Sequence, residues 1–93
     1  MSQWTGISEA REAAAKSLAS LAGEYGRDSQ LWRLCEDLWR SREAEALTSL
    51  LYGDFRNAEV ILKRGLDILT HAPALVRNGE LPLEEAALLL AAV

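Results

Sequence analysis

The chain has 93 residues, of which 49 % are hydrophobic and 26 % charged, and its formal net charge at pH 7 is −4. This length suits a single domain, expected to span residues 1–93. An acidic chain gains little from counterion release on a polyanion, so the charge balance argues against a non-specific nucleic-acid-binding protein. Cys35 is the single cysteine, so no internal disulfide can form, and a reducing compartment suits the chain best.

Ala, Leu, Glu and Arg dominate the chain, and proline occurs at only two positions, a composition that favours an all-α fold. The N-terminal stretch has neither the basic nor the apolar segment of a signal peptide. The longest apolar run, Ala86–Val93, is too short to span a bilayer. We therefore expect a cytoplasmic protein with no membrane span.

The first helix is expected over 8–25, after a leader over 1–7, with Ser8 or Thr5 as its N-cap. Small and large apolar residues recur on one face at three- and four-residue steps, which predicts an amphipathic helix. Gly26 supplies the stop signal.

The second helix is expected over 29–40, with Asp28 or Ser29 as its N-cap. Its apolar residues cover about 160° of the helix surface, which is wider than one contact needs. This set consists of Leu31, Trp32, Leu34, Cys35, Leu38 and Trp39. The edge formed by Trp32, Cys35 and Trp39 fills the core or meets a partner, and the pattern leaves both alternatives open.

Residues 40–43 are polar and interrupt the apolar stripe for about one turn, although the stripe then resumes in phase. One long helix over 29–52 is therefore an alternative to two helices over 29–40 and 41–52. We favour the break, because a single helix here would have about twice the mean length. A further helix is expected over 55–69, and the short connection makes it antiparallel to its predecessor.

The spacing around this connection resembles a tetratricopeptide repeat (TPR), a helix–turn–helix unit of about 34 residues with small residues where its helices touch. The matching positions are Ala46, Gly53, Phe55, Ala58, Leu62, Gly65 and Leu66. Arg42, Glu45 and Ser49 depart from the pattern, which has an aromatic residue, Leu and Tyr there, and the closing proline is late. The resemblance covers about a third of the chain and implies a central TPR-like αα-hairpin. An ordinary αα-hairpin with a Gly-Asp turn is the alternative.

The C-terminal part is expected to hold a short helical turn from Pro73, a turn at Asn78-Gly79 and a last helix over 82–92. From Ala86 to Val93 there is no polar residue, and an exposed helix is not apolar on every side. This end is therefore buried in the core, buried against a partner, or cut from a longer chain. Together these elements predict a small array of four to five helices.

The sequence offers no catalytic, cofactor-binding or metal-binding constellation. Cys35 and His71 are the only cysteine and histidine, and a structural zinc site needs more such ligands. Cys35 lies on an apolar helix face, where a thiol is typically a small core residue. We therefore expect a protein that is not an enzyme and needs no cofactor.

The favoured hypothesis is a protein-binding adaptor or chaperone that holds a helical segment of a partner. Small acidic helical proteins of this kind resemble the bacterial type III secretion chaperones, some of which have TPR-like folds. That resemblance implies a cytoplasmic hetero-oligomer. The predicted partner-binding residues are Trp32, Cys35, Trp39, Leu88, Leu89, Leu90 and Val93.

Two other hypotheses use different features. The same apolar surfaces would also serve a homodimeric regulatory or structural protein. Leu81–Leu89 resembles the first helix of excisionase-type helix-turn-helix domains, which would imply a DNA-binding regulator. Those domains continue with a basic recognition helix, however, and no basic residue follows Leu89.

Overall fold

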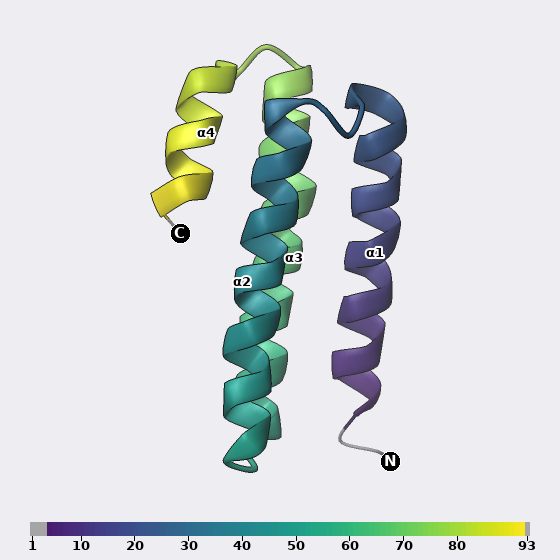
Figure 1. The fold of residues 1–93 in the computed structure, drawn as a ribbon, viewed down its shortest axis with the longest axis vertical. Coiled ribbons are helices and arrows are strands. Elements are labelled where there is room, and N and C mark those ends of the chain that lie inside the picture. Colours follow the sequence, from purple (N-terminus) through teal and green to yellow (C-terminus); the bar gives the residue numbers. More distant parts are fainter. Residues whose placement is uncertain (1–3, 93) are drawn as a thin grey trace.

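The structure is a computed structural model that describes residues 4–92, apart from the side chains of Ala87 and of residues 89–92. This part of the chain forms four α-helices and no strand, which confirms the predicted all-α class. The helices are α1 (Thr5–Tyr25), α2 (Gln30–Leu51), α3 (Phe55–Arg77) and α4 (Leu83–Ala92). Figure 1 shows α1, α2 and α3 running along the long axis, each reversing the direction of the one before, with the short α4 beside the upper part of α2.

Helix α1 begins at Thr5, three residues earlier than predicted, so the expected leader over 1–7 is wrong for its last three residues. Ile7 explains the difference, because its side chain is buried in the core and draws this turn into the bundle. Trp4 packs edge-to-face on Phe55 of α3, with the ring centroids 5.2 Å apart. Neither predicted residue is the N-cap, which is Trp4.

Helix α2 runs unbroken from Gln30 to Leu51, so the predicted break between 29–40 and 41–52 is wrong. The polar interval is held by ion pairs within the helix, between Arg40 and Glu36 at 3.5 Å and between Arg42 and Glu45 at 3.0 Å. Pairs at these spacings support a helix instead of interrupting it. The N-cap is Ser29, one of the two residues predicted for this position. Its hydroxyl oxygen accepts a hydrogen bond from the backbone N–H of Trp32 at 3.2 Å.

The turn between α2 and α3 is formed at Gly53 and Asp54, the Gly-Asp turn that the sequence indicates. Gly53 has a φ of 76°, a backbone conformation that side chains disfavour, and it ends the run of helix. The Asp54 carboxylate then caps α3 by accepting from the backbone N–H of Asn57 at 3.1 Å. The Asn57 side-chain amide also donates to the Ser49 hydroxyl at 2.7 Å, which joins the two helices next to the turn.

Helices α2 and α3 lie close together at Gly65. A Cβ atom there would lie 2.9 Å from Cγ of Arg42 and 3.2 Å from the Trp39 ring. The aliphatic stem of Arg42 therefore fills the space over Gly65, at the position where the TPR pattern has an aromatic side chain. A larger residue at this crossing would displace these side chains.

Helix α3 continues to Arg77, eight residues beyond the predicted end at 69. Proline inside a helix removes one backbone hydrogen bond and disfavours the preceding turn. The Pro73 ring is almost fully buried, however, and lines the same surface depression between α1 and α3 as Leu21, so its apolar burial offsets this loss. Beyond it, Arg77 pairs with Glu24 of α1 at 2.7 Å and fixes the two helix ends together.

Helix α4 begins at Leu83, directly after Pro82, close to the predicted start at 82. It packs against α2 and, less extensively, α3, and Ala86 is its buried contact. Among the described residues the core is apolar, with no buried charged or polar side chain. Its members from the first three helices are Ile7, Ala10, Ala14, Leu21, Leu31, Cys35, Leu38, Trp39, Ala46, Ala58, Leu62 and Leu69.

The glycine at the α2–α3 crossing gives a stability test. Gly65→Leu should lower the free energy of unfolding by about 1–3 kcal/mol, because the new side chain meets the Arg42 stem and the Trp39 ring. Gly23→Leu is the matched control, since nothing lies within 4 Å of a Cβ at that exposed helical site. There the better helix propensity should raise stability by up to about 1 kcal/mol. Urea unfolding of both variants measures the difference, and equal effects at the two sites would contradict the close crossing.

Candidate protein-binding site

The predicted partner-binding edge of α2 lies inside the bundle. Cys35 is 0 % exposed and Trp39 5 % exposed, so neither presents a surface to another molecule. Trp32 is partly buried, and its indole N–H donates to the backbone oxygen of Leu18 on α1 at 2.9 Å. The guanidinium of Arg27 lies 5.8 Å from the Trp32 ring centroid, which adds a cation–π contact on the outside. The sequence left two alternatives open for this edge, core packing and contact with a partner. In the structure all three side chains take part in core packing.

The predicted residues near the C-terminus are described only in part. Leu88 is on α4 and is 66 % exposed, so it is open to a partner. The side chains of Leu89 and Leu90, and the whole of Val93, lie outside the described residues.

A different apolar surface is found where α2 turns into α3. We define the apolar end as Trp4, Leu47, Leu50, Leu51, Tyr52 and Phe55. Leu51 and Tyr52 are each 86 % exposed, and Leu47 is 61 % exposed. Leu47 and Leu51 are four residues apart and so share one face of α2. Exposed contiguous apolar patches on small proteins commonly mark interaction sites.

A hollow of about 180 Å³ opens at the apolar end, between the start of α1 and the last turns of α2. It is lined by Trp4, Ile7, Arg11, Glu43, Ala46, Leu47, Leu50 and Leu62. The buried side chains Ile7 and Leu62 belong to the core, so the hollow gives access to the interior of the bundle. Its two charged members, Arg11 and Glu43, bind each other at 2.9 Å. An uncharged apolar group is therefore the occupant that fits.

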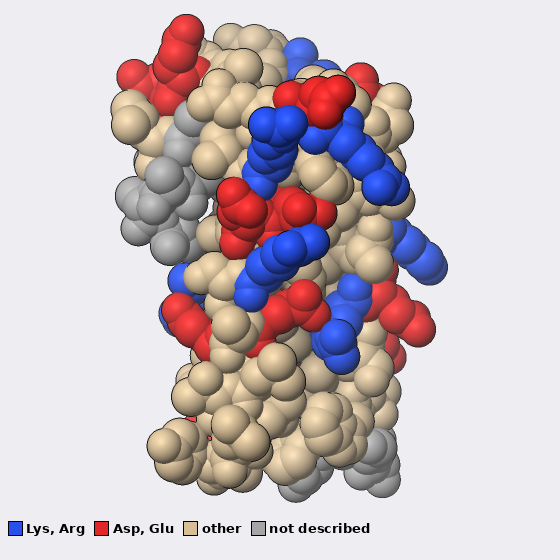
Figure 2. Space-filling model, in the orientation of Figure 1, with Lys and Arg blue, Asp and Glu red and all other residues tan. Residues whose placement is uncertain are grey.

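Charge is segregated along the molecule. Figure 2 shows Lys, Arg, Asp and Glu side chains over the upper and middle parts of one face, while the lower part, where α2 meets α3, is almost free of them. The chain accordingly has no charged residue from Ala46 to Gly53. On the outer face of α2, charged side chains such as Arg40 give way to Leu47 and Leu51 within two turns. The apolar end is thus a distinct region and not a scatter of single exposed residues.

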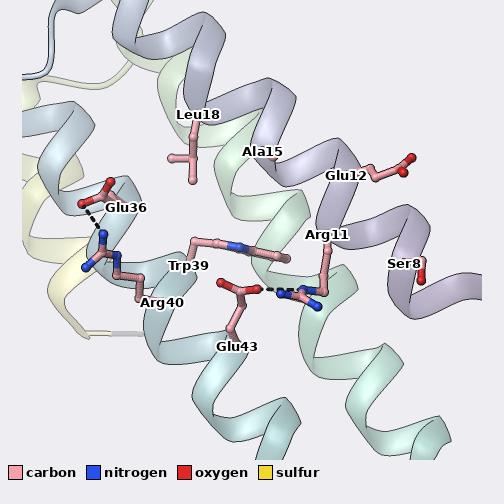
Figure 3. Close-up of a pocket in the computed structure, with 9 residues that line it drawn as sticks. All are labelled: Ser8, Arg11, Glu12, Ala15, Leu18, Glu36, Trp39, Arg40 and Glu43. Carbon is pink, nitrogen blue, oxygen red and sulfur yellow. Dashed lines mark hydrogen bonds and ion pairs between the residues drawn. The ribbon is translucent and has the colours of Figure 1, made fainter. Parts of the chain in front are cut away.

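A second depression, of about 550 Å³, runs between α1 and α2 above the hollow. Figure 3 shows Trp39 at its floor and the Arg11–Glu43 ion pair across its lower part, with Glu36 paired to Arg40 on the other wall. Arg11 and Glu43 line both the groove and the hollow and so separate them. Most of the charge in the groove is already paired within the chain, so the groove offers a charged ligand little.

No family model, curated protein or solved structure matches this chain.

The candidate site therefore rests on the geometry of the chain itself. None of the described helices is both long and apolar enough to cross a bilayer. Within residues 4–92 no group of His, Cys, Asp and Glu side chains is arranged to hold a metal ion. The apolar end is the surface in the described part of the chain that is best suited to bind another molecule.

The periodicity of the sequence puts Ala46, Leu47, Leu50 and Leu51 on one apolar helix face before Gly53, but it does not mark these residues or Tyr52 as binding residues. The available signal was the uncharged interval from Ala46 to Gly53, which is long for the end of a surface helix. Its meaning depends on α1, because Trp4 and Ile7 of that helix supply the opposite wall of the hollow.

Cys35 gives a pH-dependent prediction. Burial raises the pKa of its thiol from 9.0 to about 11, so the folded protein keeps this proton to a higher pH than the unfolded chain does. Between these values the unfolded chain binds fewer protons, and stability should fall as the pH rises through this window. Cys35→Ala removes this contribution and should flatten the fall. Urea unfolding from neutral pH to pH 11 compares the two proteins, and identical pH slopes would show that the thiol is not buried.

Proposed function

We propose that this chain is a non-enzymatic protein-binding module that buries its apolar end against a helical segment of another protein chain. The observation that carries the proposal is a hollow with an apolar floor, lined by Leu47 and Leu50 of α2, together with the nearly fully exposed side chains Leu51 and Tyr52 that end this helix. Fully burying a leucine side chain is worth about 1.5–3 kcal/mol, so the exposure of several such residues leaves free energy available for binding.

The shape of the site favours a helical occupant. The hollow lies between two helices, and amphipathic helices bind such sites by inserting apolar side chains at three- and four-residue spacing. Leu47 and Leu50 form one wall and Trp4 the other. Aromatic and leucine side chains around a desolvated pocket are typical of the centre of a protein–protein interface.

The placement of Cys35 and His71 supports a role without catalysis. Cys35 is buried with a raised pKa, which disfavours the thiolate that a nucleophile needs. His71 is on the exposed surface of α3, where its Nδ1 lies 2.7 Å from the backbone oxygen of Asp67. The two groups therefore do not form a nucleophile–base pair.

An adaptor or chaperone working in the cytoplasm is the specific form of this proposal. Three features support it: the small acidic chain, the αα-hairpin with a small residue at its crossing, and a free thiol held inside the core. The resemblance to TPR-like secretion chaperones suggests the same type of role, in which an exposed apolar surface is covered by a client protein.

Leu51→Glu should abolish partner binding, because it places a carboxylate on the exposed apolar face that Leu51 shares with Leu47, a residue that lines the hollow. The native chain, Leu51→Glu and the control Leu88→Glu are each tagged and used to recover proteins from the source cells. Leu88 is also an exposed leucine, but it is on α4. We expect the same protein to be retained by the native chain and by Leu88→Glu, and to be lost with Leu51→Glu.

The opposite pattern would contradict the proposal. A protein that is retained by Leu51→Glu and lost with Leu88→Glu would move the binding surface to α4. Circular dichroism of both variants controls for folding, which neither exposed substitution should disturb.

A further inference from the structure

We infer that the occupant of the apolar end is a second copy of this chain, so that two copies associate end to end about a two-fold axis. The inference rests on the proposed function, since it uses the same surface, and it adds the identity of the partner. Three observations carry it: the shape of the end, the charge of the hollow, and the distribution of charge along the molecule.

The apolar end has both a cavity and protruding groups that fit it. The hollow is about 180 Å³, and a cavity of about 150 Å³ in another protein is known to hold a benzene molecule. One leucine or tyrosine side chain is therefore of the right size to enter. Leu51 is 86 % exposed, directly follows Leu50 and shares a helix face with Leu47, and both of those residues line the hollow.

A two-fold axis satisfies both features at once. In such an interface both copies use the same surface, so each contact occurs twice. Each copy inserts a side chain into the other and receives the same side chain from it. Leu51 of one copy would enter the hollow of the second, while Leu51 of the second copy enters the hollow of the first. One copy alone cannot make this contact, since α2 is a rigid helix up to Leu51 and turns its Leu51 side chain outward.

The charges of the hollow favour an uncharged partner. Arg11 and Glu43 are the only charged residues among those that line the hollow. They form an ion pair with each other at 2.9 Å, so neither needs an opposite charge from a partner. The segment that would enter, from Ala46 to Gly53, has no charged residue either. A partner selected by charge, such as a basic or acidic peptide, finds no unpaired charge among the residues that line the hollow.

The net charge does not oppose the association. Each copy has a formal charge of −4, and two copies would repel if their charged surfaces met. The molecule is 40 Å long, and Figure 2 shows the charges of that face away from the apolar end. Screening at physiological salt acts over about 8 Å, so contact through these ends keeps most of the like charges apart.

Sedimentation equilibrium over a range of protein concentrations tests the inference. The native chain should approach a mass of twice 10.2 kDa with rising concentration. Leu51→Glu should raise the dissociation constant by about a hundredfold or more, because a central apolar contact becomes a buried carboxylate. Leu88→Glu, the matched control on α4, should leave the dissociation constant unchanged. A native chain that is monomeric throughout, a dimer that only Leu88→Glu disrupts, or open-ended growth beyond the dimer would each overturn the inference.

Binding of the dye anilinonaphthalene sulfonate to dilute protein separates this inference from the proposed function. If the native chain is monomeric, binds the dye and loses that binding in Leu51→Glu, the apolar end is open to a different protein; the second copy is then refuted and the proposed function stands. If the monomer binds no dye, both are refuted, since the end is covered within one chain.

Discussion

The contact between α2 and α3 at Gly65 is the interaction on which the rest of the structure depends. Because no side chain intervenes there, the stem of Arg42 and the ring of Trp39 lie directly on the α3 backbone. The two longest helices are thereby packed against each other. Helices α1 and α4 then pack on this pair. A larger side chain at the crossing would separate the helices and open the core that the other two elements cover.

This arrangement also determines which surfaces are covered. The Trp32–Trp39 edge of α2 is used within the chain, since α1 covers Trp32 and α3 packs against Trp39. Helix α4 has 10 residues and α2 has 22, so α4 is less than half as long, and it lies beside the end of α2 opposite the turn. The last turns of α2 are therefore left with exposed leucines and an open hollow. The surplus apolar surface that the sequence indicates is present, but at the turn and not at the tryptophan edge.

The all-α class, the Gly53–Asp54 turn and the caps of α2 and α3 were predictable because they follow from local rules of helix capping and periodicity. The continuity of α2 was not, since it depends on ion pairs that form only if the helix is already continuous. The passage of α3 through Pro73 goes with burial of the ring in the folded bundle, which local sequence does not reveal. The hollow was unpredictable for the same reason, because Trp4 and Ile7 meet Leu47 and Leu50 only after the bundle has formed. Local propensity thus predicted the elements, whereas tertiary packing determined their lengths and the site.

The central claim is that two copies of the chain meet through the apolar end. Amide NMR spectra recorded from low micromolar to millimolar concentration test it most directly, because they report on each residue separately. The account predicts concentration-dependent shifts or line broadening confined to the first turn of α1 and to the segment from Ala46 to Gly53. Shifts confined to α4 or to the α1–α2 groove, or spectra that do not change with concentration, would contradict it.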